Sequence, residues 1–146
     1  MSKPAVVVMA HADPRHLTRL LDALDPWSVA LHIDVKTAYD VHAAMTADLP
    51  NRVQLLPRLR TGWARWENVD AELNGYRAVL ADPEVTHVIV MTGSDYPPAA
   101  ASAIETLLAA HPRRPLPATW FPPAPPSARR PGGLAPPAPP PPVPRP

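Results

Sequence analysis

The 146-residue sequence contains no cysteine, a single phenylalanine and only five glycines. The absence of cysteine excludes a disulfide framework, a zinc–thiolate site and thiol catalysis. No basic stripe is interleaved with exposed aromatic residues, so we expect no binding to nucleic acid. The apolar run over residues 5–10 is too short for a signal peptide or a membrane span. The sequence therefore predicts a cytoplasmic protein, and it leaves peripheral association with a membrane open.

Proline, by contrast, is abundant and unevenly distributed. Residues 112–146 hold 16 of the 24 prolines, five arginines and no acidic residue, whereas residues 1–111 hold all 13 acidic residues. A segment of this composition cannot bury enough apolar surface to form a core. We therefore expect an α/β domain over residues 1–111, followed by a disordered Pro/Ala/Arg-rich tail over residues 112–146.

Within residues 1–111 the apolar pattern alternates between strands and helices. A continuous β-branched run predicts a buried strand over 5–9, and further strands are expected over 29–33, over 53–56 and, again buried, over 87–91. Helices are expected after the Asp13-Pro14 start signal, over 40–48 with Val41, Ala44 and Met45 inward, from Trp66 to about Asp82-Pro83, and around Ile104. Short connections between alternating strands and helices predict a Rossmann-like parallel sheet.

The helix that begins near Trp66 has a regular apolar stripe. Its members are Trp66, Val69, Leu73, Tyr76 and Leu80, at spacings of three and four residues. This spacing predicts that the stripe, Trp66 included, faces the core. Acidic residues of the same helix, Glu67, Asp70 and Glu72, are interpreted most simply as its solvated face, although Asp70 and Glu72 lie close enough to the apolar stripe to leave a second role open.

Three polar clusters follow predicted strands: His11-Ala-Asp13, His32-Ile-Asp34 and Gly93-Ser-Asp95-Tyr96. Ligands of parallel α/β sheets bind beyond the carboxyl ends of the strands, so these clusters are expected at one site. Neither GxGxxG nor GxxxxGK[ST] occurs, which excludes a standard dinucleotide fingerprint or P-loop. The pair His11 and Asp13 lacks a third ligand, and we expect no metal there.

Individual residues of these clusters have two interpretations each. Asp34 either accepts hydrogen bonds from a ribose or a uracil, or it is a turn carboxylate. Asp95 either binds sugar hydroxyls or an acceptor, or it belongs to a simple turn. Trp63 either stacks on a sugar ring or packs in the core.

Four segments, taken in order, resemble the amino-terminal half of the core-2/I-branching β-1,6-N-acetylglucosaminyltransferase family, which also contains peptide O-xylosyltransferases. They are VVVMAHADPRHLTRLLDAL, VALHIDVKT, RTGWARWENVDAELNGYRAVL and HVIVMTGSDYPP, within about residues 4–110. The most specific pieces are the H-x-D triplet ending at Asp34, the W-x-x-V-x-A-x-L run from Trp66, and the loop Thr92-Gly-Ser-Asp-Tyr-Pro97.

The resemblance implies the first half of a GT-A-type fold that moves N-acetylglucosamine from UDP-GlcNAc to a glycan or protein hydroxyl with inversion. UDP-xylose is the alternative donor. Carried over by position, Val8 to His11 would line the uracil, Asp34 would contact the uridine, and Asp95 would lie near the donor sugar and acceptor. Many members need no metal, and Asp34-Val-Lys36 is not a D-x-D motif, so we expect no cofactor.

The catalytic base and the residues that bind the diphosphate would follow residue 111 in this family, where the present chain turns to proline. One hypothesis is a change of reading frame near codons 105–120, which would leave an inactive donor-binding half. The alternative is a genuine polyproline II tail that recruits a proline-recognising module, attached to a non-catalytic nucleotide-binding scaffold.

Overall fold

The structure is a computed structural model that describes residues 2–111. Its elements alternate as the sequence predicts: β1 (Pro4–Ala10), α1 (Pro14–Ala23), β2 (Ser28–Ile33), α2 (Tyr39–Thr46), β3 (Val53–Leu55), α3 (Trp66–Val79), β4 (His87–Thr92) and α4 (Ala101–Ala110). The predicted α/β class is confirmed. The disordered tail predicted over 112–146 lies outside the described residues.

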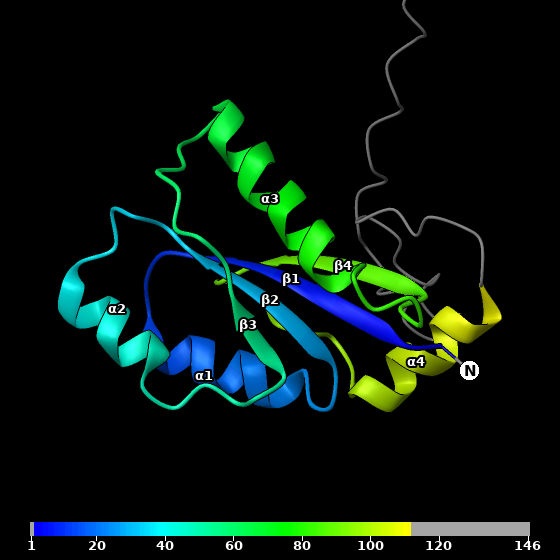
Figure 1. Ribbon diagram of the computed structural model, residues 1–146. Helices are drawn as coiled ribbons and strands as arrows, with labels where there is room; N and C mark the ends of the chain where they lie inside the picture. The colour runs from blue at the N-terminus through cyan, green and yellow to red at the C-terminus, as the bar shows by residue number, and fades with distance from the viewer. Residues whose placement is uncertain (1, 112–146) are drawn as a thin grey trace, which may run out of the picture. The chain divides into compact units, whose positions relative to one another are not determined.

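The strands of the described part form one parallel sheet in the order β3-β2-β1-β4 (Figure 1). Strands β2 and β3 follow one another on the same side of β1. The chain then crosses back and places β4 on the other side of β1. Strand order therefore reverses between β1 and β4. Loops that leave the two strands at such a point leave room for a ligand between them.

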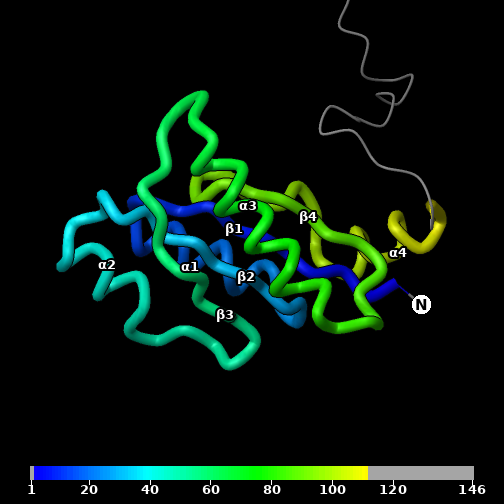
Figure 2. The backbone as a smooth tube through the Cα atoms, turned by 45° about the horizontal axis from the view of Figure 1, so that its top comes forward, coloured from blue at the N-terminus to red at the C-terminus, as the bar shows by residue number. Residues whose placement is uncertain are grey.

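Helices cover both faces of the sheet. Helices α1, α2 and α4 lie on one face, and α3 lies on the other (Figures 1 and 2). The first face holds the larger apolar cluster, in which Leu17, Leu20 and Leu24 of α1 are almost wholly buried. Alternate residues of β1 point into the two clusters, as the two-residue period of a strand requires.

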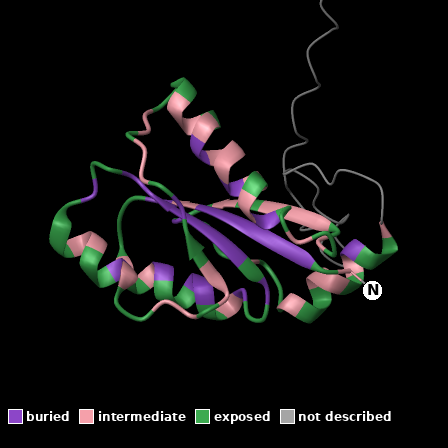
Figure 3. Ribbon diagram, in the orientation of Figure 1, coloured by how far each residue is buried: buried purple, intermediate pink, exposed green. Residues whose placement is uncertain are grey.

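The face of α3 that packs on the sheet differs from the predicted one. Trp66 is 70% exposed, Val69 and Leu80 are also exposed, and the prediction of a core Trp66 is wrong. The buried positions are instead small, Ala71, Gly75 and Val79, as the colours of Figure 3 show along the helix. A Cβ on Gly75 would meet Val7 Cγ1 at 2.3 Å, so α3 approaches β1 too closely for larger side chains.

Two further expectations about burial need correction. Strand β4 was predicted to be buried, but it lies at an edge of the sheet, and Val90 is 42% exposed. Ala44, expected to face inward, is exposed, whereas Met45 is buried. A strand with a single neighbour leaves apolar side chains accessible, so β-branched composition alone does not distinguish it from a central strand. Among the described residues, no helix combines the length and apolar character needed to cross a membrane.

Candidate functional site

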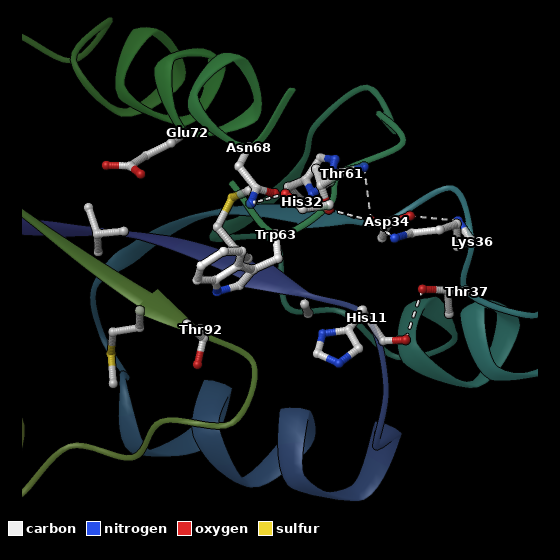
Figure 4. A pocket seen from close by; sticks show the side chains of 15 residues that line it. His11, His32, Asp34, Lys36, Thr37, Thr61, Trp63, Asn68, Glu72 and Thr92 are labelled. Atoms are coloured by element: carbon white, nitrogen blue, oxygen red, sulfur yellow. Dashed lines mark hydrogen bonds and ion pairs between the residues drawn. The ribbon is translucent and has the colours of Figure 1, made fainter. Parts of the chain in front are cut away.

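A cavity of about 750 Å³ lies at the carboxyl ends of the strands, on the face of the sheet that α3 covers. Its walls come from the end of β1, from the loops after β2 and β3, from α3 and from β4 (Figure 4). The lining residues are Met9, Ala10, His11, His32, Asp34, Lys36, Thr37, Thr61, Gly62, Trp63, Asn68, Glu72, Val90, Met91 and Thr92. The cavity therefore opens where the strand order reverses. His11, His32 and Asp34 of the first two polar clusters line it, whereas the third cluster, Gly93 to Tyr96, does not.

Asp34, at the end of β2, is 3% exposed and joins two of the loops around the cavity. Its Oδ1 accepts from the amide of Lys36 at 2.7 Å, and its Oδ2 accepts from the amide of Thr61 at 3.0 Å and from the Thr61 hydroxyl. Burial would raise the pKa of this carboxyl, but these hydrogen bonds, with the charge of Lys36, hold the pKa below its usual value. Asp34 is thus an ionised anchor whose two oxygens both have protein partners.

The loop after β2 has a second anchor in Arg58. Its Nη2 donates to the carbonyl oxygens of Asp34 at 2.8 Å and Thr37 at 3.1 Å. Its Nε donates to the carbonyl of Ile33 at 3.3 Å. A guanidinium with several donors in one plane can hold several carbonyls at once. Arg58 therefore gives the loop a single backbone shape.

His32 is buried beneath the cavity. Its Nε2 lies 3.0 Å from the amide nitrogen of Leu59 and accepts that hydrogen bond, so the ring carries its proton on Nδ1. Burial lowers the pKa of His32, and nearby Arg58 lowers it further against the opposing charge of Asp34. His32 is therefore a neutral structural group that ties the segment after β3 to β2.

The predicted donor-binding residues divide into two groups. His11 is exposed and lines the cavity, and its backbone carbonyl accepts from Thr37 Oγ1 at 2.9 Å. Val8 is wholly buried in the cluster beneath α1, on the other face of the sheet, and its strand is paired on both sides. The expectation that Val8 lines a ligand is therefore corrected, because its side chain points away from the cavity. Asp13 caps α1, accepting from the amide of His16 at 2.9 Å.

Of the two residues assigned to the sugar and acceptor, the structure brings only one to the cavity. Trp63 lines it and is 95% exposed, so its place is at the rim and not in the core. Asp95 does not line the cavity: its Oδ2 accepts from the amide of Thr92 at 2.6 Å, within the turn after β4. Gly93 of that turn packs against Ala10, where an added Cβ would approach within 2.9 Å.

Thr61, Asn68 and Glu72 are lining residues that the sequence analysis did not identify. Asn68 and Glu72 are one turn apart on α3, on the side of the helix that includes Ala71 and Gly75. Glu72 was interpreted as part of a solvated face, whereas it faces the cavity (Figure 4). The small residues Ala71 and Gly75 were the available signal, because a helix packs closely on a sheet through such positions.

The donors and acceptors of the cavity suit a ligand that has two parts, one uncharged and hydroxylated and the other anionic. Lys36 supplies positive charge, Glu72 supplies negative charge, His11 supplies an imidazole ring, and Asn68 and Thr92 supply uncharged polar groups. Within residues 2–111, no three His, Asp or Glu side chains are grouped so as to hold a metal ion. Neither a protein-family model nor a curated protein matches this sequence.

Proposed function

We propose that the described residues are the donor-binding half of a glycosyltransferase, and that the cavity binds a UDP-sugar. UDP-GlcNAc is the proposed donor, and UDP-xylose is the alternative. One observation carries the proposal. The four segments on which the family resemblance rests each contribute to the same cavity: His11 from the first, Asp34 from the second, Trp63 and Glu72 from the third, and Thr92 from the fourth. Segments up to 81 residues apart thus converge where parallel sheets bind ligands.

The residues that line the cavity are assigned to donor binding, and the transfer step needs a base outside the described residues. In an inverting transfer the acceptor hydroxyl attacks the anomeric carbon, a base takes its proton, and the bond to the UDP oxygen breaks. Positive charge must then stabilise the leaving diphosphate. The resemblance assigns both groups to positions after residue 111, so the acceptor, a glycan or protein hydroxyl, is proposed on the resemblance alone.

Calorimetric titration of the full chain with UDP tests the proposal. We expect binding that Asp34→Ala weakens by about 1.5–3 kcal/mol, since a buried carboxylate and the loops it holds are lost together. Glu67→Ala is the matched control, because it also removes an acidic side chain, but one that lies outside the cavity and pairs with Arg65. Absence of UDP binding by the unmodified chain, or equal losses in both variants, would contradict the proposal.

A second variant separates direct contact from loop support. Thr61→Val removes the hydroxyl that donates to Asp34 Oδ2 but leaves the carboxylate in place. If Asp34 contacts the nucleotide, Thr61→Val weakens UDP binding much less than Asp34→Ala does. Equal effects would mean that Asp34 acts only by holding the two loops.

A further inference from the structure

Two carboxylates line the cavity, and they differ in how they are bonded. Both oxygens of Asp34 accept hydrogen bonds from Lys36 and Thr61. Glu72 has a single protein partner within residues 2–111: its Oε1 accepts from the hydroxyl of Tyr76, and its Oε2 has none there. Glu72 is therefore the carboxylate of the cavity with one oxygen that accepts no hydrogen bond from the described residues.

Tyr76 holds Glu72 in this orientation from the next turn of α3. The hydrogen bond to Glu72 is the main cause that raises the pKa of Tyr76 to about 12, and partial burial and the negative charge of the carboxylate add to it. Tyr76 consequently stays protonated at any physiological pH and keeps donating to Oε1. A carboxylate fixed at one oxygen loses less side-chain freedom when the other oxygen binds.

Two further lining residues, Trp63 and Asn68, add groups suited to a sugar ring. Trp63 exposes its indole at the cavity rim. Asn68, one turn before Glu72, donates from Nδ2 to the carbonyl of Gly62 at 2.7 Å, and in the described part of the chain its Oδ1 has no partner. A pyranose has a C–H face that packs on an aromatic ring and hydroxyls that donate to carboxylate and amide oxygens.

Charge distinguishes the two ends of the cavity. Figure 4 shows Lys36 and Thr37 at one end and Glu72 at the other, with Trp63 between them. Lys36 is half-exposed, and its Nζ lies 3.8 Å from Asp34 Oδ2. A phosphate near Glu72 would meet a like charge that no cation of the lining offsets, whereas at the other end the charge of Lys36 offsets that of ionised Asp34. A ligand with an anionic part and a hydroxylated part therefore has one favourable orientation.

We propose that Glu72 is a specificity residue that accepts hydrogen bonds from hydroxyls of the donor sugar, with the sugar ring packed on Trp63 and the nucleotide directed toward Lys36. This inference rests on the proposed function, and it assigns the sugar to α3 and the loop before it. Glu72 also takes the role near the donor sugar that the sequence analysis gave to Asp95, because the Asp95 carboxylate accepts from the amide of Thr92 within its own turn.

The test compares the affinity for UDP with that for UDP-GlcNAc and UDP-xylose, by calorimetry on the full chain. We expect at least one UDP-sugar to bind more tightly than UDP, and Glu72→Gln to reduce this gain about tenfold while the affinity for UDP stays unchanged. Gln can still accept from Tyr76, so the variant removes charge and little else. Asp70→Asn is the matched control, because Asp70 is on the same helix and does not line the cavity.

The outcomes separate the inference from the function on which it rests. No binding of UDP to the unmodified chain would overturn the proposed function. Binding of UDP without a gain from either sugar, or a gain that Glu72→Gln leaves intact, would overturn the inference alone. A measurement on the unmodified chain keeps the test open if Glu72→Gln does not fold: saturation-transfer NMR should show strong transfer to the ring protons of the bound sugar, and its absence would overturn the inference.

Discussion

At the residue scale, the loops around the cavity depend on two buried polar side chains, one of them charged and the other neutral. Asp34 is held ionised by the hydrogen bonds it accepts, and His32 is held neutral by burial. Each accepts a hydrogen bond from a backbone amide of the segment after β3. A buried donor or acceptor left without a hydrogen-bond partner at either position would cost about 1–3 kcal/mol. The shape of these loops is therefore coupled to the protonation states of His32 and Asp34.

The neutral state of His32 predicts how stability depends on pH. Since its folded pKa is lowered, the unfolded chain takes up a proton below the ordinary value of 6.5 before the folded chain does. The contribution of His32 is therefore fully present above that pH and is lost as the pH falls below it, by at most about 1.4 kcal/mol per pH unit.

Urea unfolding between pH 7.5 and 5 measures this slope. His32→Gln offers an oxygen in place of Nε2 to the amide of Leu59 but does not titrate, so its unfolding free energy should change less over the same range. A variant with the same slope as the unmodified chain would show that another group is responsible.

At the element scale, α3 owes its position to small residues. Its buried face of Ala71, Gly75 and Val79 lets the helix approach β1, and this approach brings Asn68 and Glu72 to the cavity. The larger apolar residues of the helix, Trp66 among them, are exposed. Close approach, rather than apolar side-chain volume, thus decides which side of α3 faces the sheet.

Gly75→Ala tests this arrangement. Alanine is favoured over glycine within a helix by about 1 kcal/mol, but here the added methyl overlaps both γ-methyls of Val7. We expect a net loss of about 1–3 kcal/mol in the free energy of unfolding, as is usual for an overpacked core. Thermal or urea unfolding measures the loss.

The double variant with Val7→Ala is the control for this prediction. Val7→Ala removes the methyl groups that the new Cβ meets, so the two changes together should cost less than the sum of their separate costs. Additive costs would show that the loss comes from somewhere other than this contact.

At the scale of the whole described molecule, the sheet is covered unequally. β1 has a strand on each side and helices over both faces, whereas β4 has one neighbouring strand and an exposed Val90. Local opening is easiest where few apolar contacts and few shared hydrogen bonds must be broken. Residues at the end of the best-protected strand, β1, and of the less protected β4 both line the cavity.

Amide hydrogen exchange should reproduce this order. We expect the amides of β1 to exchange most slowly and those of β4 to exchange markedly faster, because opening β4 breaks one ladder of hydrogen bonds and opening β1 breaks two. Mass spectrometry of peptides that cover the two strands measures the difference. Equal protection of β1 and β4 would indicate that the edge of β4 is covered in solution.

The amino-acid sequence by itself determined the order and type of the elements, the N-cap at Asp13 and the edge of the sheet where the cavity lies. These follow from local patterns: β-branched runs, an N-cap followed by proline, and the rule that carboxyl ends of parallel strands share an edge. Only the tertiary structure decided which side of α3 is buried, that Val8 faces away from the cavity, and that both oxygens of Asp34 accept hydrogen bonds from the described residues while Glu72 accepts from them at only one oxygen. Those outcomes depend on distances between residues remote in sequence, such as Gly75 and Val7 or Asp34 and Thr61, which no local pattern contains.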